Sequence, residues 1–349
     1  MSDAAQEVLG TSGQPADTLI EIKGLETYFH LDEGVLKAVD GIDLTIHKGE
    51  TLGLVGESGC GKSVAARSVM RIVPAPGKSD GEITFAASTD NGASNEIDLL
   101  RLAPSGAEMR AIRGRDITMI FQEPMTSFSP LHTIGNQIEE AILLHRTQDP
   151  KEAREIALDM ITKVGISNPV QRIDEYPHQL SGGMRQRAMI AMALSCNPSL
   201  LIADEPTTAL DVTVQAQVID LMLGLREEYG MAMLYITHDL GVIAEIADRI
   251  AVMYLGKIIE TGNAEDIFYR PSHPYTRALL ESVPVMGRKS GERLAAIEGT
   301  VPVPINLPDR CGFAPRCKHF VEGICDVAPP QLTEAGEGHL VRCFRSSDL

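Results

Sequence analysis

The eight residues 56–63, GESGCGKS, constrain the fold of this chain more than any other segment. They match G-x-x-x-x-G-K-[ST] without a mismatch, follow the apolar run TLGLV at 51–55, and precede a helical stretch from Lys62 to about Ile72. Glycines let the backbone curl so that successive N–H groups point at one centre, and the helix N-terminus adds partial positive charge. A complete match between a strand and a helix predicts a phosphate-binding loop, not a chance glycine-rich turn.

The same loop indicates which groups hold a nucleotide. Lys62 can reach the β- and γ-phosphates of ATP, and the Ser63 hydroxyl can ligate Mg²⁺. Cys60 is interpreted as a small filler, although a thiol at a helix N-terminus can have a depressed pKa and react. We therefore expect ATP to be bound by the whole loop, which comprises Gly56, Glu57, Ser58, Gly59, Cys60, Gly61, Lys62 and Ser63.

Two adjacent acids end a second apolar run, LLIAD at 200–204 followed by Glu205. Acids at the carboxyl end of a strand lie at the edge of the sheet beside the phosphate loop. Asp204 is positioned to hold Mg²⁺ through water, and Glu205 to polarise the attacking water as general base. Such a pair alone could equally cap the next helix, but together with a phosphate loop it indicates an NTPase.

Strands and helices are expected in a definite order along the chain. Short alternating runs over residues 18–50 predict antiparallel strands. After residue 183, helices at 183–195, 212–229 and 239–247 alternate with strands at 200–204, 233–237 and 249–255, and ITMIF at 117–121 is a further strand. This α/β alternation predicts a mostly parallel sheet covered on both faces. Residues 86–107, rich in small polar residues, are interpreted as a surface insertion.

Composition limits the class of protein. The chain has 349 residues, with 31 Lys and Arg against 48 Asp and Glu, so its formal net charge is −17. A surface this acidic repels phosphate backbones, and we expect no nucleic-acid partner, although a local cradle of N–H groups can still hold ATP. No run approaches the ~20 apolar residues of a membrane span, and the acidic N-terminus lacks the basic region of a secretory signal. We therefore expect a cytosolic chain.

A third motif, LSGGM at 180–184, opens a helix about 120 residues after the phosphate loop. Here the chain resembles ABC transporter ATPases, whose signature is LSGGQ. The resemblance implies that Ser181, Gly182, Gly183 and Met184 face ATP held by the opposite subunit, so that two ATP molecules lie between the subunits of a head-to-tail dimer. A helix N-terminus suits a γ-phosphate, although a Ser-capped helix without function is the simpler alternative.

The resemblance implies roles for further residues. Gln122 matches the glutamine that senses Mg²⁺ and water and touches the membrane partner. His238 matches the histidine that contacts the γ-phosphate and the attacking water, and Asp211 belongs to the D-loop, which crosses to the other subunit. The aromatic that stacks on adenine corresponds to Phe29 or its neighbour Tyr28. A lone histidine after a strand is more often structural, and a buried aromatic more often core.

The likeness is greatest to the ATP-binding subunits of oligopeptide/dipeptide importers. It is carried by residues 119–138, 176–194 and 204–221, and RPSHPYTRALLESVP at 270–284 is also typical of them. The resemblance implies ATP hydrolysis coupled to peptide import through two transmembrane permease subunits, served by an extracytoplasmic solute-binding protein. It also implies a peripheral location on the cytoplasmic face of the inner membrane, with the permease contacting residues 122–136.

The sequence leaves alternatives for the identity of the second ATPase and of the transported solute. QEPMTS and GGMRQR resemble the first, D-type, of the two different ATPases that such importers often carry, so we expect a heterodimer. One alternative is an importer of the same family for a glycoside, an opine or nickel. Another is a soluble ABC ATPase acting on DNA or ribosomes. The acidic charge disfavours the latter, as does the absence of a long coiled-coil insertion or second cassette.

Four of the six cysteines lie in the last 39 residues, with the spacing C-x5-C-x7-C-x17-C. Zinc sites usually contain C-x2–4-C pairs, and this spacing does not. Four thiolates can instead hold an iron–sulfur cluster, and the resemblance implies a [4Fe-4S] cluster on Cys311, Cys317, Cys325 and Cys343. Zinc, or four free thiols in a proline-rich lobe, are the alternatives. His319 and His339 are interpreted as surface residues.

The expected organisation has three parts. Residues 1–17 form a flexible leader. Residues 18–270 form an ABC-type P-loop ATPase domain with a mixed sheet core, an antiparallel β subdomain and a helical signature subdomain at about 123–195. Residues 271–349, where proline recurs and periodicity fades, form a C-terminal region of the oligopeptide-transporter type that contains the four cysteines.

Overall fold

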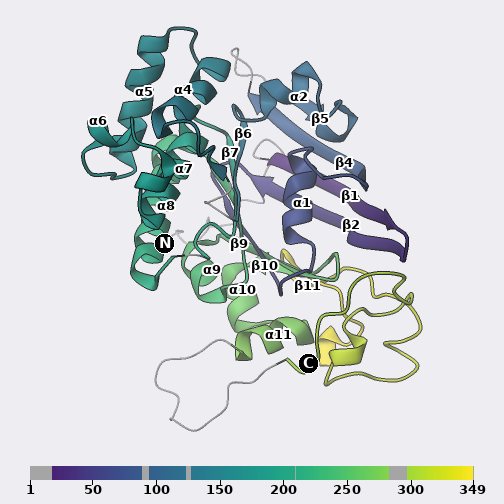
Figure 1. Cartoon of the computed structure of the whole chain (residues 1–349). Coiled ribbons are helices and arrows are strands. Elements are labelled where there is room, and N and C mark those ends of the chain that lie inside the picture. The colour runs from purple at the N-terminus through teal and green to yellow at the C-terminus, as the bar shows by residue number, and fades with distance from the viewer. Residues whose placement is uncertain (1–17, 89–93, 123–126, 209, 283–296, 349) are drawn as a thin grey trace, which may run out of the picture.

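The structure is a computed structural model that describes residues 18–88, 94–122, 127–208, 210–282 and 297–348 (Figure 1). The predicted leader, residues 1–17, lies outside these ranges. The strands are β1 (Thr18–Leu31), β2 (Gly34–His47), β3 (Thr51–Val55), β4 (Gly77–Ser88), β5 (Ser94–Asp98), β6 (Ile117–Ile120), β7 (Leu200–Asp204), β8 (Ala232–Thr237), β9 (Arg249–Tyr254), β10 (Lys257–Asn263), β11 (Thr333–Gly336) and β12 (His339–Val341). The α-helices are α1 (Lys62–Val69), α2 (Ala107–Ile112), α4 (Ile134–His145), α5 (Pro150–Lys163), α6 (Pro169–Arg172), α7 (Gly182–Leu194), α8 (Val212–Tyr229), α9 (Leu240–Ile246), α10 (Ala264–Tyr269) and α11 (Pro274–Glu281).

The larger sheet has the order β11-β12-β10-β9-β3-β8-β7-β6, and β9, β3, β8, β7 and β6 run parallel. Alternate residues of its strands point into two different buried clusters: in β7, Leu200 and Ile202 belong to one, and Leu201 and Ala203 to the other. Both faces of the parallel strands are therefore covered, as their continuous apolar runs predict. The expected mixed α/β core is confirmed.

A second, antiparallel sheet has the order β2-β1-β4-β5 and lies beside α1, which packs against both sheets (Figure 1). It confirms the antiparallel strands expected from residues 18–50. The interpretation of residues 86–107 as a surface insertion is wrong in part, because residues 94–98 form β5 and pair with β4. Leu99, which follows β5, is fully buried. The residues of β5 are mostly polar because the strand lies at the edge of the sheet. Its sequence therefore lacks the apolar alternation by which a strand is predicted.

A group of helices lies on the opposite side of the molecule from the antiparallel sheet (Figure 1). Here α4, α5 and α7 pack against one another, and α8 packs against α7. The N-termini of α4, α5 and α7 are capped: the side chains of Thr133, Asp149 and Ser181 each accept a hydrogen bond from a backbone N–H of the first turn. Within the described ranges, no helix combines the length and apolar character needed to cross a membrane.

The end of the chain is built into the larger sheet. Strand β12 pairs with β10, joining Glu260 to Val341, and β11 pairs with β12. The chain before β11 contacts β2 at residues 304 and 305. The Lys37 N–H donates to the Pro304 carbonyl at 2.9 Å, and Leu36 forms a β-bridge with Ile305. The division at residues 270 and 271 remains a prediction, but residues on both sides of it share one sheet.

A buried carboxylate fixes this junction. Glu260 on β10 is fully buried and accepts hydrogen bonds from the N–H groups of Ser272 and His273, at 2.5 and 3.0 Å. Its Oε1 lies 2.8 Å from Nε2 of His339, whose side chain is also buried. The interpretation of His339 as a surface residue is therefore wrong; its partner lies 79 residues earlier. His319, by contrast, is exposed.

Because the imidazole of His273 is buried, we expect the free energy of unfolding to fall in acid. His273 is 2% exposed, and burial lowers its pKa to about 3, below the 6.5 of an accessible histidine. Because the unfolded chain binds a proton below pH 6.5 and the folded chain does not, His273 opposes folding increasingly as the pH falls toward 3. The expected slope is about 1.4 kcal/mol per pH unit.

The measurement compares urea unfolding of the wild type and His273→Asn between pH 7 and 4. Nδ1 of His273 caps α11 by accepting from the Tyr275 N–H at 3.0 Å, and asparagine can also cap a helix. The free energy of unfolding should fall less steeply with decreasing pH in the variant. Equal slopes would show that His273 does not contribute to the acid sensitivity.

Candidate nucleotide site

The phosphate loop joins β3 to α1, and two glycines are essential to its course. At Gly56 (φ +155°) a Cβ atom would lie 2.3 Å from the Met253 carbonyl oxygen, and at Gly61 (φ +107°) 2.0 Å from that of Ala38. Any side chain would therefore collide with backbone that cannot move aside. Both glycines bring the loop against β2 and β9, which hold it in place.

The charged end of Lys62 is held inside the loop. Its Nζ donates to the carbonyl oxygens of Gly56 and Glu57, at 2.8 and 3.1 Å, and the residue is 5% exposed. The ammonium group is thus hydrogen-bonded to the backbone of the phosphate loop itself. Cys60 is almost fully buried, and burial raises the pKa of its thiol. It is the filler expected, while the depressed pKa that a helix N-terminus can give is not found.

Oxygen ligands suited to Mg²⁺ meet beside the loop. The Ser63 hydroxyl donates to Oδ1 of Asp204 at 2.9 Å, across 141 residues of sequence. Asp204 is 1% exposed, and this burial raises the pKa of its carboxyl group. A hydroxyl and a carboxylate are the ligands that Mg²⁺ takes in phosphate sites. The donor set therefore fits this ion.

The carboxylate of Glu205 is the centre of a polar cluster. Its Oε2 accepts from Nε2 of Gln122 at 2.9 Å and from the hydroxyl of Thr208 at 3.1 Å, and its Oε1 lies 3.3 Å from Nδ1 of His238. Glu205 itself has φ +47°, an uncommon conformation for a residue other than glycine. Strained backbone of this kind is concentrated at functional sites.

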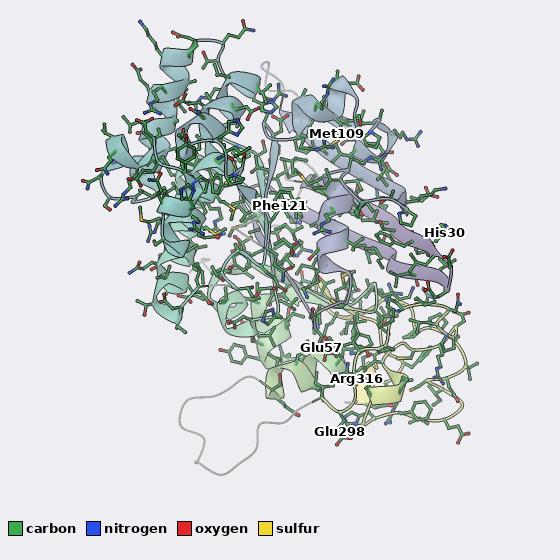
Figure 2. The ribbon with its side chains drawn as sticks, in the orientation of Figure 1. His30, Glu57, Met109, Phe121, Glu298 and Arg316 are labelled. Atoms are coloured by element: carbon green, nitrogen blue, oxygen red, sulfur yellow. The ribbon has the colours of Figure 1, made fainter. Side chains whose placement is uncertain are left out.

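The three expected residues Glu205, Gln122 and His238 thus come together from the ends of β7, β6 and β8 (Figure 2 labels Phe121, which precedes Gln122). Thr208 was not anticipated from the sequence. Its position three residues after Glu205, in a turn, is the only local signal that could have indicated it. The segment between Gln122 and Ser127, part of the expected permease contact, lies outside the described residues.

A cavity of about 450 Å³ adjoins the loop. Its lining includes loop residues 58–63, Gln122 and Glu205, together with the apolar residues Phe29, Leu36 and Ala38. Of the two candidate aromatics, Phe29 lines the cavity, whereas the Tyr28 hydroxyl donates to Asp40 at 2.5 Å. Residues 301–304, VPVP, complete the apolar wall and were not anticipated.

The signature residues do not line this cavity. Ser181 and Gly182 are exposed, and the Ser181 Oγ caps α7 by accepting from the Met184 N–H at 3.3 Å. Asp211 is also exposed and caps α8 by accepting from the Val214 N–H at 3.0 Å. A surface position away from the chain's own phosphate loop agrees with a role toward a second subunit.

The four C-terminal cysteines converge. Cys311, Cys317, Cys325 and Cys343 line one small cavity of about 20 Å³, roughly the space of a water molecule. Burial raises the pKa of the Cys311 thiol to about 11 and also raises those of Cys317 and Cys343. In the part of the chain that the structure describes, however, no group of three or more His, Cys, Asp or Glu residues has the arrangement of a metal site.

Comparisons with known proteins identify the family. Residues 39–208 match the model of the ABC transporter family, and residues 259–325 match that of the oligopeptide/dipeptide transporter C-terminal region. The oligopeptide transport ATP-binding protein AppD of Bacillus subtilis is 49% identical over 329 residues, which cover 94% of this chain and 96% of that protein. The chain belongs to the ABC transporter ATPases.

Two further likenesses agree. The dipeptide transport ATP-binding protein DppD of Escherichia coli is 44% identical to this ABC ATPase, over 95% of this chain and 97% of its own length. The solved dimer of a bacterial ABC transporter cassette is 28% identical and superposes with a TM-score of 0.61, covering 70% of this chain and 99% of that one. The protein is therefore an ATP-hydrolysing transporter subunit with the ABC fold.

Proposed function

We propose that this ABC ATPase hydrolyses ATP to drive the import of peptides through a membrane permease. The observation that carries the proposal is likeness over nearly the whole chain. Relatives 44–49% identical, each matched over at least 95% of its own length, are named as peptide, oligopeptide or dipeptide transport ATP-binding proteins. The match at residues 259–325 to the C-terminal region of such transporters supports the same solute class.

In the proposed mechanism, the loop amides and Lys62 bind the β- and γ-phosphates. Ser63, Asp204 and Gln122 would hold Mg²⁺, which when bound neutralises charge on the phosphate oxygens. Glu205 accepts a proton from the attacking water, while His238 orients that water and the γ-phosphate. The contacts of Glu205 with Gln122 and His238, at 2.9 and 3.3 Å, support this division of roles.

The proposed assembly is a head-to-tail pair of ATPases on the cytoplasmic face of the inner membrane. Ser181, Gly182 and Gly183, with Met184 and Asp211, would face the ATP of the second ATPase, which we propose to be a different chain. Two permease subunits would bind near residues 122–136, and a solute-binding protein would deliver the peptide from outside. The exposure of Ser181, Gly182 and Asp211 supports contact with a second subunit.

Uptake of labelled di-, tri- and pentapeptides by cells tests this proposal. Cells lacking the gene should lose uptake, and the wild-type gene should restore it while Glu205→Gln should not. Glu245→Gln, an exposed glutamate on α9, is the matched control and should restore uptake. Restored uptake of a glycoside, an opine or nickel, with peptide uptake unaffected by the deletion, would contradict the peptide assignment.

We further propose that the four C-terminal cysteines hold a [4Fe-4S] cluster. Their convergence on one cavity supports this, and thiolates suit both iron–sulfur clusters and zinc. The cavity would have to expand around the cluster, and the raised pKa values mean that ligation must displace thiol protons.

Metal analysis after anaerobic purification is the test. We expect about four iron and four sulfide per chain, and their loss in Cys317→Ser. Cys196→Ser is the matched control, because Cys196 lies apart, with its sulfur 3.6 Å from the Ala141 carbonyl oxygen. Zinc in place of iron would contradict the cluster, and a metal-free protein would leave four free thiols.

A further inference from the structure

Glu57 joins the phosphate loop to two residues of the C-terminal region, Arg316 and Tyr275. The two carboxylate oxygens of Glu57 accept from Nη1 and Nη2 of Arg316, at 2.7 and 3.0 Å, and its N–H donates to the Tyr275 hydroxyl at 2.9 Å. Glu57 does not line the nucleotide cavity, although its neighbour Ser58 does. Arg316 and Tyr275 therefore bind the loop at a residue that does not line the nucleotide cavity.

Arg316 is well fixed for this contact. Its side chain is 5% exposed, and its Nε donates to the Glu298 carbonyl oxygen at 3.0 Å. The guanidinium lies over the ring of Tyr254, 5.9 Å from its centroid. Figure 2 shows Glu57 and Arg316 side by side where the C-terminal region meets the ATPase core, with Glu298 below them. A bidentate pair between this buried arginine and a partly exposed glutamate defines orientation as well as distance.

The same arginine is joined to the cysteine cavity. Arg316 ends a short 3₁₀ helix, Ala314–Arg316, and Cys317 follows it directly. The Ala314 N–H donates to the Cys311 carbonyl at 3.1 Å, and the Cys317 N–H to that of Ala314 at 3.3 Å. Phe313 packs against Tyr254 and Tyr275. These contacts fix the backbone that carries the guanidinium relative to Cys311 and Cys317.

We propose that Arg316 is a positioning residue that orders the phosphate loop for ATP. A loop held in place before ATP arrives loses less conformational entropy on binding. Because Arg316 fixes Glu57 in this way, ATP should bind more tightly with the contact than without it. The positioning role is independent of the solute transported.

A double-mutant cycle tests the positioning role. Arg316→Lys keeps the charge but cannot make the bidentate contact, and Glu57→Gln removes its partner charge. Each should raise the Kd for ATP about tenfold, while kcat at saturating ATP changes by less than about twofold, because neither residue touches Glu205. The double variant should be no weaker than either single one. Arg270→Lys, an exposed arginine paired with Asp266, is the control and should leave the Kd unchanged.

Additive effects on the Kd, or a fall in kcat instead, would overturn the positioning role. Circular dichroism and thermal unfolding of each variant separate weak binding from misfolding. Should Arg316→Lys fail to fold, Glu57→Gln decides the matter alone, because a purely structural role for the contact would leave the ATP Kd of the folded variant unchanged.

Discussion

Replacing Glu205 by glutamine should lower ATP turnover about a thousandfold and leave ATP binding nearly unchanged. The amide has the shape of the carboxylate and can still contact Gln122, Thr208 and His238, which lie within 3.3 Å of it. It cannot accept the proton of the attacking water, and general bases typically contribute about 10²–10⁴-fold to a rate.

Phosphate release at saturating ATP measures the first effect, and fluorescence titration with an ATP analogue measures the second. Glu245→Gln should behave as the wild type in both. Because hydrolysis would be blocked after binding, size-exclusion chromatography with the partner ATPase and ATP should show the paired form accumulating. Turnover within a few-fold of the wild type would exclude Glu205 as the base.

Replacing Lys62 by alanine should instead abolish tight nucleotide binding. The ammonium group is almost fully buried and lies within the loop, where carbonyl oxygens accept from it at 2.8 and 3.1 Å. A hydrogen bond to a charged group contributes about 1.5–3 kcal/mol, so loss of the contacts to two phosphates should raise the Kd for ATP at least about a hundredfold.

The same fluorescence titration checks this result. Lys48→Ala is the matched control, because Lys48 is exposed in the turn between β2 and β3 and precedes the loop by only a few residues. Because the variant also removes the hydrogen bonds that the carbonyls of Gly56 and Glu57 accept from Lys62, thermal unfolding without ATP is measured alongside to show that the variant is folded. An unchanged ATP Kd would refute the role of Lys62 in binding phosphate.

Elements with strong local patterns could be predicted from sequence almost to the residue. The strand at 200–204 and the helix at 212–229 agree with β7 and α8. The former is a continuous apolar run. The latter lies between Asp211, which caps its N-terminus, and Gly230, whose φ of +62° ends it. The phosphate loop and the acids after β7 belong to the same class, since their chemistry requires particular residues at fixed spacing.

Contacts between distant segments could not be predicted in this way. Arg316 and Glu57 are 259 residues apart, and neither is unusual in its own surroundings. The VPVP segment at 301–304 shows no periodicity, yet it lines the nucleotide cavity because Pro304 pairs with β2. His339 was misjudged for the same reason: its burial depends on Glu260, on a strand far earlier in the chain.

The register of β3 has a consequence for how this protein is made. Thr51 pairs with Met233 of β8, and Leu52 with Arg249 of β9, so the strand that carries the phosphate loop has both its neighbours about 180–200 residues further along. At about 5–20 residues per second, the ribosome needs roughly 10–40 s to supply them. The hairpin of β1 and β2 can form during that interval, whereas β3 must wait with its apolar residues unprotected. Emerging chains should therefore depend on chaperones most while residues 55–255 are being translated.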